Sequence, residues 1–430
     1  MNLAFFFKDW EIKIASGLDL RQLQLYFRKM TKLIFLLSTF FMLNTHASSS
    51  HSEFWKIKIS LQNEELPFIL ERQKSHWIVH NQKEKIYLKV LSQKKSKWIL
   101  EFPLFENTLE LLFKENIVTG TWTKKSIPEN LQFELKGEKV TTDNRLTISK
   151  EIIAQSFPER WKMTFIEEGE SSDALGTFSY ENGLIQGSIL TPTGDYRFLE
   201  GMLDTKSSLV LYGFDGQFAF VIKAQVKNKE LEGTLKGGKS WITNFKASAK
   251  EDYFLPDPYQ LTKMKSGKTS FQFKGKSIDG KSIDLSLKKR NKKLTLLQIM
   301  GSWCPNCMDE ANFLSQWSQT PTGKNVEIIA MAFEKLPTEA AALTKLKKWK
   351  KELNITYPIV LASHNANEKK VLDVLPEIEK HVSYPSIYFL NESGEVIKIH
   401  TGFSGPATGR GYEDFQDELE KFVVIETAVR

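Results

Sequence analysis

The sequence predicts a protein of several domains, with an amino-terminal all-β region of meander or barrel-like form followed by an α/β domain. The chain has 430 residues, and at about 150 residues per domain this length suggests two or three domains. Apolar and polar residues alternate in short stretches over residues 48–250, as in half-buried antiparallel strands. Over residues 266–430 continuous apolar runs alternate with helical patterns, which is typical of a sheet covered on both faces.

Composition and charge exclude several classes of protein. Hydrophobic residues at 41% and charged residues at 26% are sufficient for packed cores, so the chain is predicted to be globular. The 59 Lys and Arg residues exceed the 52 Asp and Glu residues, for a formal charge of +7. These basic residues are scattered and no motif indicates a nucleic-acid partner. Only two cysteines occur, which excludes a disulfide-stapled scaffold and a four-cysteine zinc site.

Residues 1–47 are predicted to be a leader and signal peptide. The apolar run from Leu33 to Leu43 is too short for a membrane-spanning helix, which needs roughly twenty residues. Basic residues precede the run, and Ala47 ends a small-residue cleavage site, as in secretory signals. We therefore expect export to the periplasm with cleavage near Ala47, and an uncleaved anchor is the alternative. Because the basic flank lies far from the start of the chain, we hypothesise that translation begins at Met30.

The region 48–250 is predicted to form one all-β domain whose sheet coils on itself. Several predicted strands carry a glycine in the middle, which favours sharp bends or bulges. The stretches before and after residues 148–161 are loosely similar, but this similarity is too weak to establish a repeat. The region is also rich in aromatic residues that either line a ligand cavity or, as we favour, pack in the core: Trp55, Trp77, Trp98, Trp122, Tyr196, Phe198 and Phe214.

Residues 251–265 are predicted to be a linker, because Pro256 and Pro258 forbid a continuous strand or helix. In the α/β domain that follows, Asp279-Gly280 is a hairpin-turn signal. Apolar runs predict strands at 294–300, 326–333, 357–361, 386–390 and 396–400. Helical patterns occupy 304–317, 338–353, 365–375 and 412–424.

The chemistry is predicted at Trp303-Cys304-Pro305-Asn306-Cys307, between a buried strand and the next helix. Cys304 is expected at the helix amino terminus, where unpaired backbone N–H groups and the macrodipole favour a thiolate. Pro305 suits the first helical turn because its missing N–H has no partner there. The three-residue spacing brings Cys307 to the same helical face, one turn deeper. We therefore predict a redox dithiol in which Cys304 is the exposed nucleophile and Cys307 the resolving thiol.

Two other uses of the cysteine pair are less favoured. A metal site would need further ligands, yet no second cysteine pair exists and the seven histidines are dispersed. His76 and His80 share one strand face in the β region, where we expect surface residues rather than ligands. A purely structural disulfide across so short a loop would contribute little stability. We thus expect no metal and no cofactor beyond a redox-active Cys304–Cys307 disulfide.

Two segments, GSWCPNCMDE at 301–310 and VSYPSIYFLNESG at 382–394, resemble motifs of the TlpA/ResA-like branch of the thioredoxin superfamily. The resemblance covers about residues 265–424, and residues 324–375 resemble the extra β-α insertion of that branch. It implies a thioredoxin-like domain at 266–430 with thiol–disulfide oxidoreductase activity. The β region resembles the amino-terminal domain of many exported bacterial members, but the resemblance implies no function for it.

The resemblance also implies roles for individual residues. Cys304 and Cys307 match the redox pair, and Trp303 matches the tryptophan before it. Pro385 matches the cis-proline that faces the cysteines in the family. We expect Ser383, Tyr384 and Pro385 to offer backbone to an extended client segment, beside Trp303 and Pro305.

Glu310 matches the acidic residue that members of this branch use near the active site. A partly buried carboxylate there would accept the proton that Cys307 must lose during resolution. The alternative is a first-turn residue favoured by the helix macrodipole. Gln298 replaces the buried aspartate of cytosolic thioredoxins, which transfers this task to Glu310. Asn306 replaces a proline often found before the second cysteine, so the redox potential is left open.

The sequence therefore predicts an exported oxidoreductase that reduces disulfides in client proteins and receives electrons from a membrane thiol donor. One alternative keeps the chemistry and reverses it, as a disulfide oxidase or isomerase. Another alternative is a redox-sensing envelope binding protein whose β domain carries the main function. The sequence predicts no oligomeric state.

Overall fold

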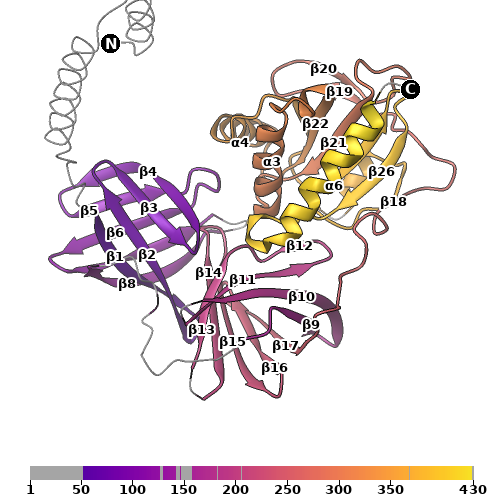
Figure 1. The fold of residues 1–430 in the computed structure, drawn as a ribbon. Coiled ribbons are helices and arrows are strands. Elements are labelled where there is room, and N and C mark those ends of the chain that lie inside the picture. The colour runs from indigo at the N-terminus through magenta and orange to yellow at the C-terminus, as the bar shows by residue number, and fades with distance from the viewer. Residues whose placement is uncertain are drawn as a thin grey trace, which may run out of the picture. The chain divides into compact units, whose positions relative to one another are not determined.

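The computed structural model describes residues 52–428 except 126–128, 142–145, 147–156, 182, 205 and 368. The predicted leader, signal peptide and Met30 start lie outside the described residues. The predicted fold class is confirmed: all-β regions come first and an α/β domain follows (Figure 1). None of the helices in this described part of the chain is long and apolar enough to cross a membrane.

The first β region is a closed barrel in which β1 pairs with both β2 and β8. Its strands are β1 (Glu53–Leu61), β2 (Glu64–Gln73), β3 (His76–Asn81), β4 (Glu84–Lys94), β5 (Lys97–Glu101), β6 (Thr108–Lys114), β7 (Ile117–Lys124) and β8 (Leu131–Val140). Trp55, Trp77, Trp98 and Trp122 are buried in its core and pack against other rings. These tryptophans therefore act as core packing residues.

The second β region is a nine-stranded antiparallel sheet that curls until β10 pairs with both β9 and β11. Its strands are β9 (Arg160–Glu167), β10 (Glu170–Glu181), β11 (Leu184–Thr191), β12 (Gly194–Asp195), β13 (Leu199–Leu203), β14 (Ser208–Phe214), β15 (Ala219–Lys227), β16 (Glu230–Gly237) and β17 (Trp241–Ala249). Trp161 and Phe245 are among the largest side chains in its core.

The glycines in the middle of strands allow neighbouring strands to approach closely. A Cβ atom at Gly120 would lie 2.0 Å from the carbonyl oxygen of Glu110, and one at Gly201 would lie 1.7 Å from that of Val210. The strand registers run through both glycines without a shift. The glycines thus serve the predicted coiling of the sheets, with no bulge at these two positions.

The α/β domain has a five-stranded sheet in the order β23-β22-β21-β25-β26. Its strands are β21 (Leu294–Met300), β22 (Val326–Phe333), β23 (Ile359–Ser363), β25 (Ser386–Asn391) and β26 (Val396–Thr401). Its helices are α3 (Pro305–Trp317), α4 (Glu339–Glu352), α5 (Lys370–Val374) and α6 (Arg410–Thr427). The smaller elements are β18 (Lys263–Met264), β19 (Lys274–Lys276), β20 (Ser282–Asp284), β24 (Ile378–Lys380), η1 (Gly323–Asn325) and η2 (Pro406–Thr408).

Both faces of this sheet are covered, as the apolar strands predict. Helices α3, α4 and α6 contribute to one hydrophobic cluster through Leu314, Trp349 and Leu419. The β19–β20 hairpin and α5 contribute Ile283 and Val371 to the cluster on the other face. This packing holds the end of β21 and the start of α3 between two cores, which is where the cysteines lie.

The helix predicted at 365–375 is shorter in the structure, because α5 begins only at Lys370. Asn365 instead forms a β-bridge with Lys335, and the N–H of Ala366 donates to the carbonyl of Glu334 at 2.7 Å. These contacts with the end of β22 satisfy backbone groups that a helix would otherwise use. The long-range pairing therefore overrides the local helical pattern.

Candidate active site

The dithiol lies where β21 gives way to α3. Cys304 is the N-cap residue of α3, and its sulfur accepts a hydrogen bond from the backbone N–H of Cys307 at 3.3 Å. Pro305 occupies the first turn of the helix. The two cysteines are therefore one helical turn apart, and the Cys304 sulfur faces the free N–H groups of the helix amino terminus.

The prediction that Cys304 is exposed is wrong. Cys304 is only 7% exposed and Cys307 is fully buried. Residues of the second β region contact the chain before and after Cys304: Gln217 donates its side-chain N–H to the carbonyl of Trp303 at 3.3 Å, and Gly194 packs on Asn306. Cys304 is still the more exposed of the two thiols, as predicted, but it is largely covered.

The loop before β25 faces the nucleophile. The peptide bond between Tyr384 and Pro385 is cis, and the Cys304 thiol donates to the carbonyl oxygen of Tyr384 at 3.6 Å. The Tyr384 ring meets the Trp303 ring edge-on at 5.4 Å. Ser383 donates its hydroxyl to a carbonyl of the second β region, that of Thr193, at 2.8 Å. The structure thus brings the predicted residues Trp303, Cys304 and 383–385 together.

Trp303 is anchored rather than free to turn. Its indole N–H donates to the carbonyl of Phe333 at 3.0 Å, and the ammonium of Lys335 lies 3.7 Å from the ring centre. These contacts join the active-site turn to the end of β22. The ring is consequently held against Tyr384 beside the nucleophile.

Glu310 lies on α3 and is fully buried, more deeply than expected. The side-chain amide of Gln298 on β21 donates to one Glu310 carboxylate oxygen at 2.8 Å, and among the described residues the other oxygen has no partner. Burial, together with the charge of Cys304, raises the pKa of Glu310 well above its usual value. Burial and the interaction with Cys304 likewise raise the pKa of the Cys307 thiol.

These shifts describe a site that keeps Cys307 protonated while a carboxylate of raised basicity lies nearby. A carboxylate with a raised pKa is a better proton acceptor than an ordinary one. Gln298 stands where cytosolic thioredoxins carry a buried aspartate. Its side-chain amide donates to Glu310 and so orients that carboxylate. This arrangement suits a proton acceptor for the resolving thiol.

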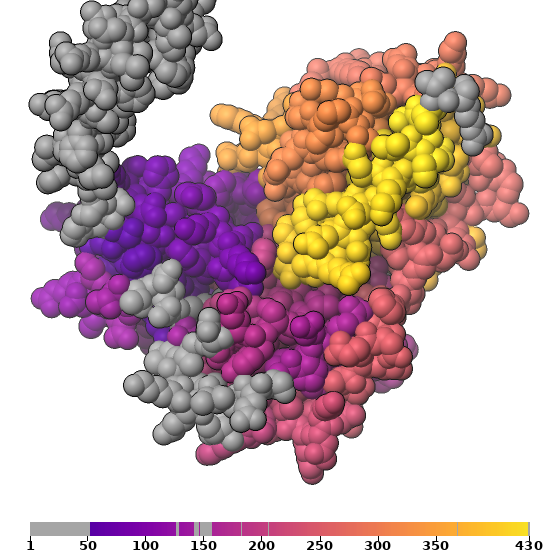
Figure 2. Space-filling model, in the orientation of Figure 1, coloured from indigo at the N-terminus to yellow at the C-terminus, as the bar shows by residue number. Residues whose placement is uncertain are grey.

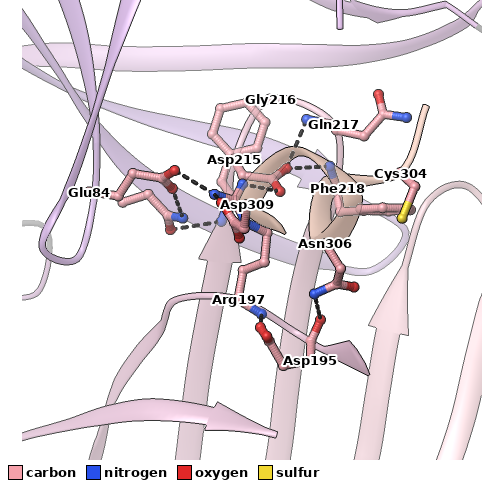
Figure 3. Close-up of polar contacts among 12 residues, drawn as sticks. Glu84, Asp195, Arg197, Asp215, Gly216, Gln217, Phe218, Cys304, Asn306 and Asp309 are labelled. Carbon is pink, nitrogen blue, oxygen red and sulfur yellow. Dashed lines mark hydrogen bonds and ion pairs between the residues drawn. The ribbon is translucent and has the colours of Figure 1, made fainter. Parts of the chain in front are cut away.

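A buried charge cluster lies next to the dithiol, and no local sequence pattern indicates it. Arg197 is bound by three carboxylates from three different regions of the chain (Figure 3). It contacts Glu84 at the start of β4 at 2.6 Å, Asp215 after β14 at 2.9 Å, and Asp309 on α3 at 2.9 Å. The Arg197 side chain is only 6% exposed. Asp309 follows Cys307 by two residues, so this cluster ties the active-site helix to both β regions.

Asp309 is the most unusual acid of the cluster. Burial and the nearby Glu84 and Asp195 raise its pKa to about 7, although Arg197 opposes the shift. Asp195 accepts the backbone N–H of Gly405 at 2.7 Å, which attaches the same β segment to the loop before α6. Figure 2 shows the start of α6 against residues of the second β region. The interface therefore combines buried charge with direct backbone contacts.

Asn306, one of the two residues between the cysteines, contacts this β segment directly. Its side-chain amide donates to the carbonyl of Asp195 at 3.2 Å (Figure 3). A Cβ atom at Gly194, which has φ +152°, would lie 2.7 Å from the Asn306 side-chain oxygen, so this close approach requires glycine. Gly194 and Asp195 belong to residues 190–197, LTPTGDYR, and no local pattern in this stretch indicates that it lies at the active site.

No cluster of three or more metal-ligating side chains occurs among the residues that the structure describes. His80 instead pairs with Glu71 at 2.8 Å, and His76 is exposed. The expectation of a surface residue therefore holds for His76 but is wrong for His80, whose side chain is only 15% exposed and pairs with the buried Glu71.

Comparison with known proteins finds a family match for the α/β domain. Residues 264–414 match the family model described as Redoxin. This match lies within the α/β domain and supports oxidoreductase activity for it. No curated protein matches the chain.

Several solved structures resemble the chain weakly. A thioredoxin-family thiol:disulfide interchange protein from Chlorobium tepidum is 19% identical over 34% of this chain and 94% of its own, with a TM-score of 0.25. A secreted disulfide oxidoreductase of Mycobacterium tuberculosis is 17% identical over 36% of this chain and 96% of its own, with a TM-score of 0.26. StoA from Bacillus subtilis is 22% identical over 35% of this chain and 94% of its own, with a TM-score of 0.25. Likenesses this weak carry no argument about activity.

Proposed function

We propose that the protein is an exported thiol–disulfide oxidoreductase of the TlpA/ResA-like type that reduces disulfides in client proteins. The observation that carries this proposal is the Cys304 sulfur, capped by the N–H of Cys307 and facing the Tyr384 carbonyl beside cis-Pro385. The signal-like segment before Ala47 supports export to the periplasm.

The exchange proceeds in two balanced steps. The Cys304 thiolate attacks one client sulfur, the client S–S bond breaks, and the departing client sulfur takes up a proton. The Cys307 thiolate then attacks Cys304, which releases the second client sulfur as a thiolate that is protonated in turn. The client gains two electrons and the protein is left with a Cys304–Cys307 disulfide. A membrane dithiol donor would restore the reduced pair.

In the second step Cys307 must first lose its proton. Glu310 is the buried acid whose charge acts on Cys307, and its raised pKa suits it to accept that proton. Gln298 holds Glu310 in place through the amide contact. Ser383, Tyr384 and Trp303 would hold the client segment at the nucleophile.

A trapping experiment tests the proposal. Replacing Cys307 by Ala should leave mixed disulfides between Cys304 and clients, which mass spectrometry of the purified adducts would identify. The matched control is Cys304→Ala, which should trap nothing. If both variants recover the same proteins, or if Cys307→Ala recovers none, client reduction by this dithiol is refuted.

The direction of the exchange is tested by the reduction potential. A value well below about −180 mV favours a reductase, whereas one between roughly −120 and −180 mV favours an oxidase or isomerase. If the wild-type protein reduces no disulfide but its β regions bind a partner equally well with Cys304→Ala, the redox-sensing alternative would replace the proposal.

A further inference from the structure

A pocket of about 490 Å³ opens beside the dithiol, between the second β region and the active-site helix. Pro305 and Tyr384, which flank Cys304, form part of its wall on the α/β side. Tyr196, Phe218 and Phe220 form part of the wall on the β side. Pockets of this volume hold small molecules or a few residues of a peptide, and not the surface of a folded domain.

The β wall carries these three aromatic rings among polar and acidic side chains, and the Phe218 ring is partly exposed. Phe218 is 37% exposed and stacks on Phe220, with 5.5 Å between ring centres and 13° between planes. Tyr196 meets Phe220 edge-on at 5.3 Å. The Lys124 ammonium lies 4.4 Å from the Phe218 ring centre, so this ring is held by a cation as well as by Phe220. The surface of Phe218 that remains exposed offers contact to an aromatic or large aliphatic side chain.

The rim of the pocket is fastened to the α/β domain. Besides the bond from Ser383 to the Thr193 carbonyl, Asn306 donates to the Asp195 carbonyl. Arg197 makes two contacts with Asp309, at 2.9 and 3.0 Å. Residues 191–197 are thus held close to Cys304, where a bulky client would otherwise approach.

We infer that this pocket selects the substrate of the dithiol: it binds a short extended peptide segment that carries the disulfide next to an aromatic or large aliphatic side chain. The same rim disfavours disulfides on the surface of folded proteins. This inference rests on the proposed thiol–disulfide exchange and adds to it a specificity wall supplied by the second β region.

Binding is tested without chemistry. The probe is a fluorescent hexapeptide with phenylalanine beside a serine that replaces the cysteine, and its anisotropy is measured with the purified reduced protein. Phe218→Ala should weaken binding about tenfold, as expected for loss of a central aromatic contact. Thr193→Trp, at an exposed rim position, should fill the pocket and weaken binding at least as much. Ile117→Ala, at a residue 61% exposed on the first barrel, is the control and should bind as the wild type does.

Selectivity is tested by single-turnover exchange of the reduced protein. The substrates are a disulfide peptide containing phenylalanine, the same peptide with glutamate in that place, and the phenylalanine peptide grafted into a surface loop of a folded carrier. The wild type should react about tenfold faster with the free phenylalanine peptide than with either of the others. Phe218→Ala and Thr193→Trp should remove this preference while the reduction potential, an equilibrium property of the dithiol, stays unchanged.

The outcomes separate the two proposals. Equal rates on all three substrates, or binding that neither variant weakens, would overturn the inference and leave the exchange chemistry standing. Peptide binding with no exchange of any substrate would overturn the proposed function and, with it, the assignment of the pocket to disulfide substrates.

Discussion

The two β regions contact the α/β domain through ion pairs that differ in their exposure to solvent. The first barrel reaches α4 through Glu106, which pairs with Lys345 at 3.2 Å and Lys348 at 3.0 Å, and these side chains are 13–25% exposed. The second region reaches α3 through Arg197, which is 6% exposed, and Asp309, which is 11% exposed. Both contacts include ion pairs, and the first barrel also places Phe105 in the hydrophobic cluster of α3, α4 and α6, but only the second contact lies beside the dithiol.

The difference in exposure predicts which contact has the larger effect on the site. Partly exposed ion pairs are screened by water and salt and contribute about 0–1 kcal/mol each. Removing one partner of a buried pair leaves an uncompensated charge and costs about 3–5 kcal/mol. The Arg197 cluster should therefore govern both stability and access to Cys304, whereas the barrel contact should mainly orient α4.

The largest effect is expected from Arg197→Gln. Glu84, Asp215 and Asp309 would lose their shared cation, so the free energy of unfolding should fall by about 3–5 kcal/mol. Alkylation of Cys304 by iodoacetamide should become several-fold faster, because residues 191–197 would be loosened. Denaturant unfolding and mass-spectrometric alkylation rates measure the two effects.

Arg290→Gln is the matched control, because Arg290 is also a buried arginine, paired with Glu327 at 2.8 Å inside the α/β domain. It should lower stability without exposing Cys304. Equal alkylation rates in the two variants would show that the Arg197 contact does not restrict access.

A pH-dependent effect is expected from Asp309→Asn. The pKa of Asp309 is raised to about 7 from an ordinary value near 3.8, and burial is the largest cause. Its stabilising contribution as a neutral acid is thus present below about pH 4 and is lost as the pH rises through 7. Asn cannot ionise, so the variant should lose this decline, which is on the order of a few kcal/mol.

Unfolding free energies at pH 4.5 and pH 8 measure the decline. Asp417→Asn, which alters an exposed carboxyl of α6, is the control. An unchanged decline in Asp309→Asn would contradict the assignment of this titration to the cluster.

The smallest effect is expected from Glu106→Gln in the barrel contact. Burial opposes ionisation of Glu106, but Lys345, Lys348 and Lys125 outweigh it and lower the pKa to about 2. A lowered pKa gives stability that is present above about pH 4.5 and lost as the pH falls towards 2. Since the pair is partly exposed, we expect at most about 1 kcal/mol at neutral pH, and less in high salt.

Acid unfolding with and without salt measures the contribution of Glu106 to the free energy of unfolding. Glu110→Gln, at an exposed ion pair of the same barrel, is the comparison. If Glu106→Gln lowers the free energy of unfolding as much as Arg197→Gln does, the distinction between the two contacts is wrong.

Much of the α/β domain follows from local sequence. The run at 294–300 matches β21, and the helix expected from residue 304 begins at Pro305, because apolar runs and cap residues act over a few positions. The helix expected at 365–375 is shortened by pairing with the end of β22, a contact that no local pattern shows. Residues that carry long-range pairs thus mark the limit of such prediction.

The local sequence was sufficient to place the two cysteines at the start of a helix, spaced so that the Cys304 sulfur caps the helix and accepts the backbone N–H of Cys307. The covering of Cys304 by the second β region could be seen only in the folded chain. Arg197 and Asp309 lie 112 residues apart in the chain yet share two hydrogen bonds. Helix caps depend on neighbouring residues, whereas burial of Cys304 and pairing of distant charges depend on which surfaces pack together, and that is a property of the folded chain alone.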